Sequence, residues 1–349
     1  MTRRSPFALL CLIAAALLAA PNAVAEAEAQ GQSAAEGWTV PRLPDGRPDL
    51  GGVWDFRSIT PLERPEEFAG RDRLTEEDEA ALVERALDRQ IDRAPPPGEV
   101  GGYNQFWMDR GIEVNENRRT SLIVDPPDGR LPPLAEGAVR QQGSLLEDIP
   151  GELPVRYRAG GLNADGPEHR GIAERCLLGF NVGPPMRPGG YNNNMQLFQT
   201  ADQVTILHEM VHDFRVIPLD DRPHLPDHMP QWLGSSRGRW EGDTLVVETT
   251  NFTDKTPAYD PNGTTGLGIG ANMHLVERFT RTADDILLYE YTLTEPETFT
   301  RPFTVAINMR RGAAPIFEYA CHEGNYGMFD ILAGGRHQER EAQAAGGSR

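Results

Sequence analysis

The sequence predicts a mostly β fold: an antiparallel meander that closes into a barrel or sandwich of lipocalin-like size, after an irregular N-terminal region with one or two helices. Residues 274–281, 286–293 and 303–309 alternate apolar and polar side chains, as half-buried strands do. Short turn-forming segments separate these strands, which favours antiparallel neighbours. Together with 36 glycines and 29 prolines in 349 residues, this pattern is typical of a loop-rich sandwich or barrel.

The first 25 residues have the three parts of a secretory signal peptide. Arg3 and Arg4 are basic, residues 7–20 are apolar, and residues 23–25 form a cleavage site of the A-x-A type. We therefore expect cleavage after Ala25 and a periplasmic or extracellular mature protein. The apolar stretch is short for a membrane anchor, so we expect no integral membrane segment in the mature chain.

Composition narrows the choice of partners. The formal net charge of −18 at pH 7 disfavours nucleic acid and anionic membranes, so the partner that we expect is a small molecule. Beyond the signal peptide two cysteines remain, Cys176 and Cys321. In an oxidising compartment we expect them to form one disulfide, and metal ligation by thiolates is the alternative.

The N-terminal part of the mature chain shows few regular patterns. Residues 26–37, which are small and acidic, are predicted to form a disordered leader. The region 38–175 is predicted to be irregular except for one clear helix at 75–93, where Thr75 is the N-cap and Asp78 follows three positions later. Short strands are expected in this region at 53–56 and 120–124.

The β-rich domain is predicted to span 176–337 and to be followed by a disordered tail, 338–349. Besides the three alternating segments, strands are expected at 195–199, 204–216, 244–250 and 316–321.

The centre of this domain carries the motif H-E-x-x-H in His208, Glu209 and His212. On a helix, both histidines share one face and can hold Zn²⁺ while Glu209 acts as general base, as in helix-borne zinc hydrolases. On a strand, Glu209 points to the other face of the sheet. The two histidines then lie about 13 Å apart, which is too far for one ion.

The residues around the motif favour the strand. Residues 204–216 alternate and are rich in β-branched types, and Pro218 would end any helix after a short length. Residues 200–203 suit a hairpin turn. Thr200 and Gln203 also have the pattern of a capping box, however, so a helix and the zinc hydrolase stay as the alternative.

Four motifs resemble those of a large, mostly uncharacterised family of secreted proteins from Gram-negative bacteria. They are PDGRPDLGGVW (44–54), RTSLIVDPPDGRLP (119–132), RWEGDTLVVETTNF (239–252) and YACHEGNY (319–326). The resemblance covers nearly the whole mature chain. It implies secretion and assigns no catalytic role to any residue.

Polar side chains suited to proton or metal chemistry gather in three clusters along the sequence. These are His208, Glu209, His212 and Arg215; then Asp221, His224 and His228; then Cys321, His322, Glu323 and Tyr326. If the meander closes, loops at the strand ends meet at one mouth, where the clusters could converge.

The candidate site residues come mainly from these clusters. We expect the catalytic groups to be Glu209, His212, His322 and Glu323. We expect the ligand-binding groups to be Arg215, Asn193, Asn194, His224 and Tyr326. The tyrosine and three amides at 191–194 can bind a polar ligand or satisfy backbone groups in turns.

Three functions fit these observations. The leading hypothesis is a secreted β-rich protein whose polar, His- and Glu-lined pocket holds a small organic ligand and supports acid–base or hydrolytic chemistry. The alternative is a zinc-dependent, metallopeptidase-like hydrolase with His208 and His212 as ligands, and zinc is expected only in that case. The third is a non-catalytic envelope binding module.

Overall fold

Most strands of the chain belong to one antiparallel sheet. The computed structural model describes residues 38–94, 97, 104–142, 166–262, 265–312 and 315–346. All of them belong to one compact unit, Ser33–Arg349. The signal peptide and leader that we expect at 1–37 lie outside the described residues. The ten strands of the sheet are β1 (Gly52–Asp55), β2 (Ile123–Asp125), β4 (Asn194–Gln199), β5 (Gln203–His208), β6 (Phe214–Pro218), β7 (Ser235–Glu241), β8 (Thr244–Thr250), β10 (His274–Arg281), β11 (Ile286–Thr294) and β12 (Phe303–Arg311).

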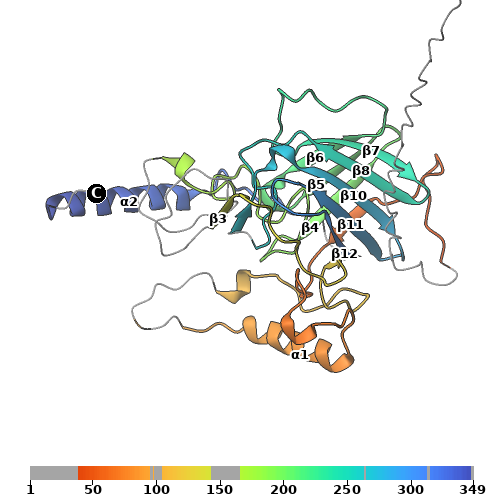
Figure 1. Ribbon diagram of the computed structural model, residues 1–349, viewed down its shortest axis with the longest axis horizontal. Coiled ribbons are helices and arrows are strands. Elements are labelled where there is room, and N and C mark those ends of the chain that lie inside the picture. Colours follow the sequence, from red (N-terminus) through yellow and green to blue (C-terminus); the bar gives the residue numbers. More distant parts are fainter. Residues whose placement is uncertain are drawn as a thin grey trace, which may run out of the picture. The chain divides into compact units, whose positions relative to one another are not determined.

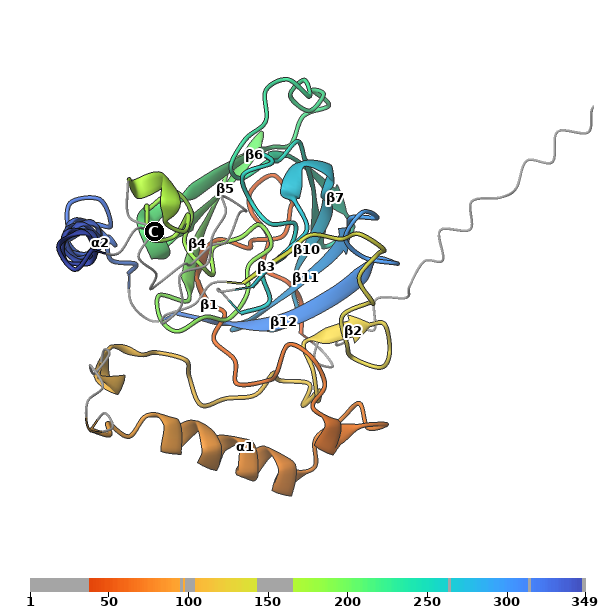
Figure 2. The same ribbon diagram turned by 60° about the vertical axis from the view of Figure 1, so that its left-hand side comes forward.

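Nine of these strands form a continuous path. Their order is β6-β5-β4-β1-β12-β11-β10-β8-β7, and β2 pairs with β12 beside the path (Figure 1; β1 and β2 are labelled in Figure 2). Each of the eight neighbouring pairs along this path is antiparallel. Because the number of pairs is even, the first strand, β6, and the last strand, β7, run in the same direction. Residues 219–234 join these two strands as a long crossover, which is the kind of connection that parallel strands need.

The two ends of this path lie against each other. A Cβ added to Gly238 of β7 would come within 2.7 Å of the Leu219 side chain and 2.9 Å of the Ile217 side chain. Glycine at this position therefore allows the edge of β7 to approach the edge of β6. The sheet curves accordingly into a nearly closed barrel (Figure 2), which confirms the fold class predicted from the sequence.

The strand pattern of the second half of the chain matches the prediction closely. Strand β10 alternates strictly between partly exposed and buried residues, and β11 and β12 pair with it and with each other in continuous register. Strand β8 also lies where we expected it, whereas β7, with the polar sequence SSRGRWE, was not predicted. The barrel interior is filled by large side chains, of which Trp54, Phe279, Tyr289, Tyr291 and Phe303 are fully buried.

The N-terminal region contributes to the barrel. Helix α1 (Glu76–Arg89) begins at the predicted cap, where Thr75 Oγ1 accepts from the Asp78 N–H and the Asp78 carboxylate accepts from the Thr75 N–H. Strand β1 lies between β4 and β12, and β2 covers part of β12. The predicted boundary at residue 175 is therefore not a division between folding units.

Strand β1 also supplies a central packing residue. The indole N–H of Trp54 donates to the Leu50 carbonyl at 2.9 Å. The Arg311 guanidinium lies 4.7 Å from the centre of the indole ring, and that of Arg281 lies 5.9 Å from it. Cation–π contacts of this kind stabilise a buried arginine next to an aromatic ring.

Smaller elements lie outside the main sheet. Strand β3 (Arg140–Gln142) pairs with β9 (Thr265–Leu267) in a second, two-stranded sheet. The short 3₁₀ helices are η1 (Glu66–Phe68), η2 (Gln105–Trp107), η3 (Pro167–His169), η4 (Met210–His212) and η5 (Gly270–Asn272).

The C-terminal segment differs from the prediction. The expected strand 316–321 is wrong, because these residues have no regular structure and lead into a turn. Helix α2 (Tyr326–Ala344) follows, with Asn325 Oδ1 accepting from the Met328 N–H, and it runs into the segment 338–349 that we expected to be disordered. No helix in the described part of the chain is long and apolar enough to cross a bilayer.

Candidate functional site

The H-E-x-x-H segment forms a hairpin. Strand β5 ends at His208, the 3₁₀ helix η4 follows, and β6 begins at Phe214. The expected single strand 204–216 is therefore interrupted. The φ angles of Val211 (62°) and His212 (46°) are positive, so the chain reverses through left-handed backbone that L-residues rarely adopt.

Because the segment forms this turn, it is not the helix that the zinc hydrolase interpretation requires. His208 and His212 do not lie one helical turn apart: His208 is 1 % exposed, and His212 is exposed. Among the residues that the structure describes, no group of three or more His, Cys, Asp or Glu side chains is arranged to hold a metal ion.

We call the end of the barrel at this turn the loop end. Strands β4, β6, β7, β10 and β12 begin there, and β1, β5, β8 and β11 end there, because each neighbouring pair is antiparallel. The turn is tied to β4 at this end. The Glu209 N–H donates to the Asn194 carbonyl at 3.0 Å, and Asn194 Nδ2 donates to Glu209 Oε2 at 2.8 Å. Two candidate site residues therefore meet, in a contact that orders the turn.

The first and third clusters of candidate residues lie side by side. His212 Nδ1 is 2.9 Å from the Tyr319 carbonyl oxygen, and Met210 and Val211 pack in a small core that includes Cys321. The expected disulfide between Cys176 and Cys321 is present and joins positions 145 residues apart. Three residues expected at the site (His322, Glu323 and Tyr326) point to solvent, and Tyr326 is 77 % exposed.

The second cluster lies on the crossover between β6 and β7. His224 Nδ1 is 2.7 Å from the carbonyl oxygen of Ser235, the first residue of β7, so this histidine is near the loop end. Asp221 and His228 are exposed. Asp221 and His228 make no hydrogen bond or ion pair within the described residues, so the structure does not bring the whole cluster to one point.

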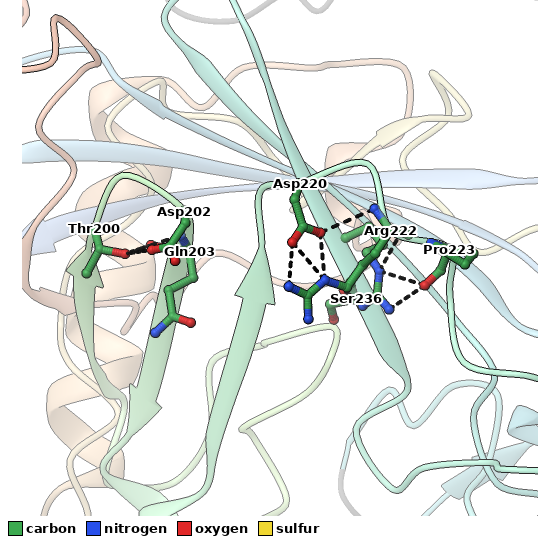
Figure 3. A network of polar contacts seen from close by, with 8 residues as sticks. Thr200, Asp202, Gln203, Asp220, Arg222, Pro223 and Ser236 are labelled. Carbon is green, nitrogen blue, oxygen red and sulfur yellow. Dashed lines mark hydrogen bonds and ion pairs between the residues drawn. The ribbon is translucent and has the colours of Figure 1, made fainter.

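Exposed polar contacts surround the start of this crossover and the β4–β5 turn (Figure 3). Thr200 Oγ1 donates to Asp202 at 2.7 Å, in the turn predicted at 200–203. Arg222 Nε donates to Asp220 at 2.7 Å, and this hydrogen bond holds the pKa of Asp220 below its usual value. Because both partners are exposed, the ion pair contributes little to stability.

Asn193 has a structural role. Its Oδ1 accepts from the Gly189 N–H at 2.7 Å and from Asn181 Nδ2 at 3.1 Å, and its Nδ2 donates to the Asp109 carbonyl at 3.0 Å. The side chain is fully buried. It therefore satisfies backbone and side-chain groups of the loop 176–193, as amides in turns commonly do.

Arg215 lies inside the barrel and not at its mouth. Its guanidinium makes two hydrogen bonds to the Glu277 carboxylate, at 2.6 and 3.0 Å, and Tyr289 donates to the same carboxylate at 2.8 Å. Burial alone lowers the pKa of Arg215, but the adjacent Glu277 outweighs this effect and raises it. Burial raises the pKa of Tyr289 well above its usual value.

Two loops close over this network at the loop end. The N–H of Met186 donates to the Tyr289 hydroxyl at 3.1 Å, and Tyr259 shares a hydrogen bond of 2.9 Å with Tyr291. Burial raises the pKa of Tyr259 to about 12. The loops 176–193 and 251–262 thus fasten onto tyrosines that project from β11 into the barrel.

A shallow hollow of about 10 Å³, open to solvent, lies between these loops. Its lining residues are Phe180, Pro185, Arg187, Pro257, Ala258, Tyr259 and Asp260. Arg187 Nη2 donates to the Phe180 carbonyl at 2.8 Å and lies 3.9 Å from Asp260 Oδ1. The sequence did not indicate these residues as a site, because none of them belongs to a motif or to an alternating strand.

The sequence pattern did not identify Glu277 or Tyr289 as site residues either, although the position of Glu277 in its strand is unusual. Glu277 occupies the inward phase of β10, between buried Leu275 and Phe279. A charged residue at an apolar phase requires a buried partner. Its position therefore could have indicated an internal ion pair, but not with which residue.

Comparisons with known proteins add little. No family model matches the chain, and no curated protein matches it. A crystal structure of a mutant of the fluorescent protein UnaG is 14 % identical, with a TM-score of 0.21, over 35 % of this chain and 72 % of that chain. A similarity at this TM-score carries no argument about the fold.

Proposed function

We propose that this protein is secreted and binds a small organic carboxylate in the hollow at the loop end of its barrel. The observation that carries this proposal is the hollow itself, which Arg187 lines together with Phe180 and Tyr259. Small-molecule sites in proteins combine apolar walls with a few placed polar groups in this way. The disulfide supports an oxidising compartment, in agreement with the predicted signal peptide.

The chemistry of the lining residues indicates the ligand class. A guanidinium recognises a carboxylate through charge-assisted hydrogen bonds, and the partly exposed ring of Phe180 favours a flat, aromatic body. The filled barrel interior leaves this ligand at the mouth of the barrel. A binding role of this kind does not depend on Glu209, His212, His322 or Glu323.

Replacing Arg187 by glutamine tests the proposal. We expect the dissociation constant of an aromatic carboxylate, with benzoate as the first probe, to rise at least ~10-fold, because a hydrogen bond to a charged group contributes roughly 1.5–3 kcal/mol. Isothermal titration or NMR shift titration measures this change. Benzamide, which lacks the charge, should bind wild type and Arg187→Gln equally weakly.

The matched control is Arg222→Gln, which removes an arginine from an exposed ion pair at the other end of β6. This variant should bind benzoate as wild type does. Equal binding of benzoate by wild type and Arg187→Gln would contradict the proposed site, and so would an absence of binding at millimolar benzoate.

A second function, acid–base catalysis at the hairpin turn, is favoured by one observation. Val211 and His212 are consecutive non-glycine residues with positive φ, and such strained backbone persists mainly where function requires it. The strained turn presents the His212 imidazole to solvent, with its Nδ1 held by the Tyr319 carbonyl. Neutral imidazole held in this way has Nε2 available as a general base.

His212→Ala tests this second function. If His212 is a general base, we expect hydrolysis of an activated ester such as p-nitrophenyl acetate to fall ~100-fold or more. His228→Ala is the matched control, because His228 is also exposed but lies on the crossover loop. Equal rates for the two variants would show only the background reactivity of surface histidines and would exclude catalysis at the turn.

A further inference from the structure

Three arginines of the N-terminal region are brought together by backbone pairing. Arg73 and Arg119 lie directly opposite each other in an isolated antiparallel bridge, and the Thr120 N–H donates to the Asp72 carbonyl at 3.1 Å beside it. Residues opposite each other in such a bridge project to the same side, with Cβ atoms roughly 5 Å apart. Arg64 also lies near this bridge: its Nε donates to Thr120 Oγ1 at 2.9 Å, and its charge acts on Arg119.

Two of these arginines are buried without a counter-charge. Arg64 is 6 % exposed and Arg119 is 7 % exposed. Within the described residues, neither has a carboxylate oxygen within 4 Å, and the Arg119 guanidinium makes no hydrogen bond. Arg64 Nη2 and Arg119 Nε are both buried without a hydrogen-bond partner.

Other buried arginines of this protein are paired. Arg215 is bound to Glu277, Arg170 to Glu174, and Arg281 is 2.9 Å from Asp284. The chain has 52 acidic and 34 basic residues, so acidic partners are plentiful. Three neighbouring arginines without an ion pair to any described residue are therefore unusual for this chain.

The arrangement is unfavourable on its own. Burial lowers the pKa of Arg119, and the nearby charge of Arg73 lowers it further; Asp72 opposes this effect, and Arg64 adds the smallest lowering. Like charges opposite each other on paired strands are destabilising, and a buried charge without a partner costs more. A bound anion would remove both costs.

We propose that Arg64, Arg73 and Arg119 form a binding site for a tetrahedral oxyanion, a phosphate or sulfate group. Guanidinium groups bind such anions through pairs of N–H donors in fixed geometry, better than lysine does. Arg73 is exposed and opens the site to solvent, while Arg64 and Arg119 form its inner wall. The Arg73 side chain is oriented by a hydrogen bond to the Asn117 carbonyl.

Thermal unfolding in phosphate tests this site. The melting temperature of wild type should rise by roughly 4 °C or more as inorganic phosphate is increased to about 100 times its dissociation constant, and should keep rising with the logarithm of the concentration. Sulfate should act similarly, whereas sodium chloride and sodium acetate at equal ionic strength should not. Isothermal titration with inorganic phosphate gives the dissociation constant directly.

Two variants test whether phosphate binds at these arginines. Arg119→Gln should melt at a higher temperature than wild type in phosphate-free buffer, because it removes a buried unpaired charge, and it should lose the response to phosphate. Arg73→Gln changes an exposed residue and should fold normally, with a dissociation constant for phosphate at least ~10-fold higher.

The matched control is Arg118→Gln. Arg118 is adjacent to Arg119 but is paired with Glu79 of α1 at 2.8 Å, so its replacement should leave phosphate binding unchanged. An equal rise in melting temperature from chloride would overturn the proposal, as would an undiminished phosphate response in Arg119→Gln and Arg73→Gln.

Discussion

Glu277→Gln is expected to destabilise the protein by about 3–5 kcal/mol, because it leaves the Arg215 guanidinium charged and unpaired inside the barrel. Glu277 is fully buried, and the side chain of Arg215 is 3 % exposed. Water cannot replace the lost carboxylate at this depth. A typical domain is stable by only about 5–15 kcal/mol, so one substitution would remove a large share of the total.

The double variant Arg215→Met, Glu277→Leu separates the loss of the pair from the loss of either partner. Replacing a buried ion pair by apolar side chains of similar volume is often nearly neutral. Some loss should remain here, because the Tyr289 hydroxyl also donates to Glu277 and would lose its acceptor. We therefore expect the double variant to be more stable than Glu277→Gln and somewhat less stable than wild type.

Denaturant unfolding at neutral pH measures both effects. The midpoint should fall strongly for Glu277→Gln and recover in the double variant. Thr280→Val is a useful control, because Thr280 lies on the same strand and its hydroxyl shares a partly buried hydrogen bond of 2.7 Å with Thr244. If Glu277→Gln unfolds at the same midpoint as Thr280→Val, the ion pair does not stabilise the barrel.

The fold was predictable where side-chain alternation agreed with burial. In β10 the phase that holds Leu275 and Phe279 is the buried phase, and β11 is apolar and buried over most of its length, so the sequence pattern marked both strands and their turns. Helix α1 was predictable because its capping box is local. In contrast, β7 has few apolar residues, because Gly238 faces the closing edge and the other positions are mainly polar.

The hairpin at the centre of the chain shows why pattern alone misled the prediction. Apolar residues continue to alternate through the turn, at Met210, Phe214 and Val216. The turn nevertheless exchanges the two faces, so that Phe214 and Val216 are exposed while Arg215 is buried. A buried arginine on β6 is stable only because Glu277 faces it from β10, which no local pattern shows.

The candidate site was predictable only in part. The disulfide followed from counting cysteines, and it brings the H-E-x-x-H turn against the segment that precedes α2. The hollow depends on two loops that are about 70 residues apart in sequence and meet through Tyr289 and Tyr291. Its residues could not be found because their proximity results from the closure of the barrel.

Removing the disulfide is the second change for which we expect a large effect. The variant Cys176→Ser, Cys321→Ser should lose about 5 kcal/mol of stability in the chain-entropy model, since the bond closes a loop of 145 residues and a 100-residue loop corresponds to about 4.7 kcal/mol. Denaturant unfolding of the oxidised wild type and of the variant measures the difference. A reductant should lower the stability of wild type toward that of the variant and leave the variant unchanged.

Unfolding of the disulfide-free variant should begin at the hairpin turn. Val211 adopts a positive φ that costs roughly 1–3 kcal/mol, and the small core around the disulfide holds it there. Without the covalent link, the segment 315–325 is held near this turn by noncovalent contacts alone: the contact between His212 and the Tyr319 carbonyl, the stacking of Tyr319 on Tyr191, and the hydrogen bond from Asn325 to the Glu174 carbonyl. Chymotrypsin should therefore cleave the variant after Phe317 or Tyr319 much faster than it cleaves wild type, under conditions where the barrel is still folded. Cleavage at equal rates would mean that packing, and not the disulfide, fixes this segment on the turn.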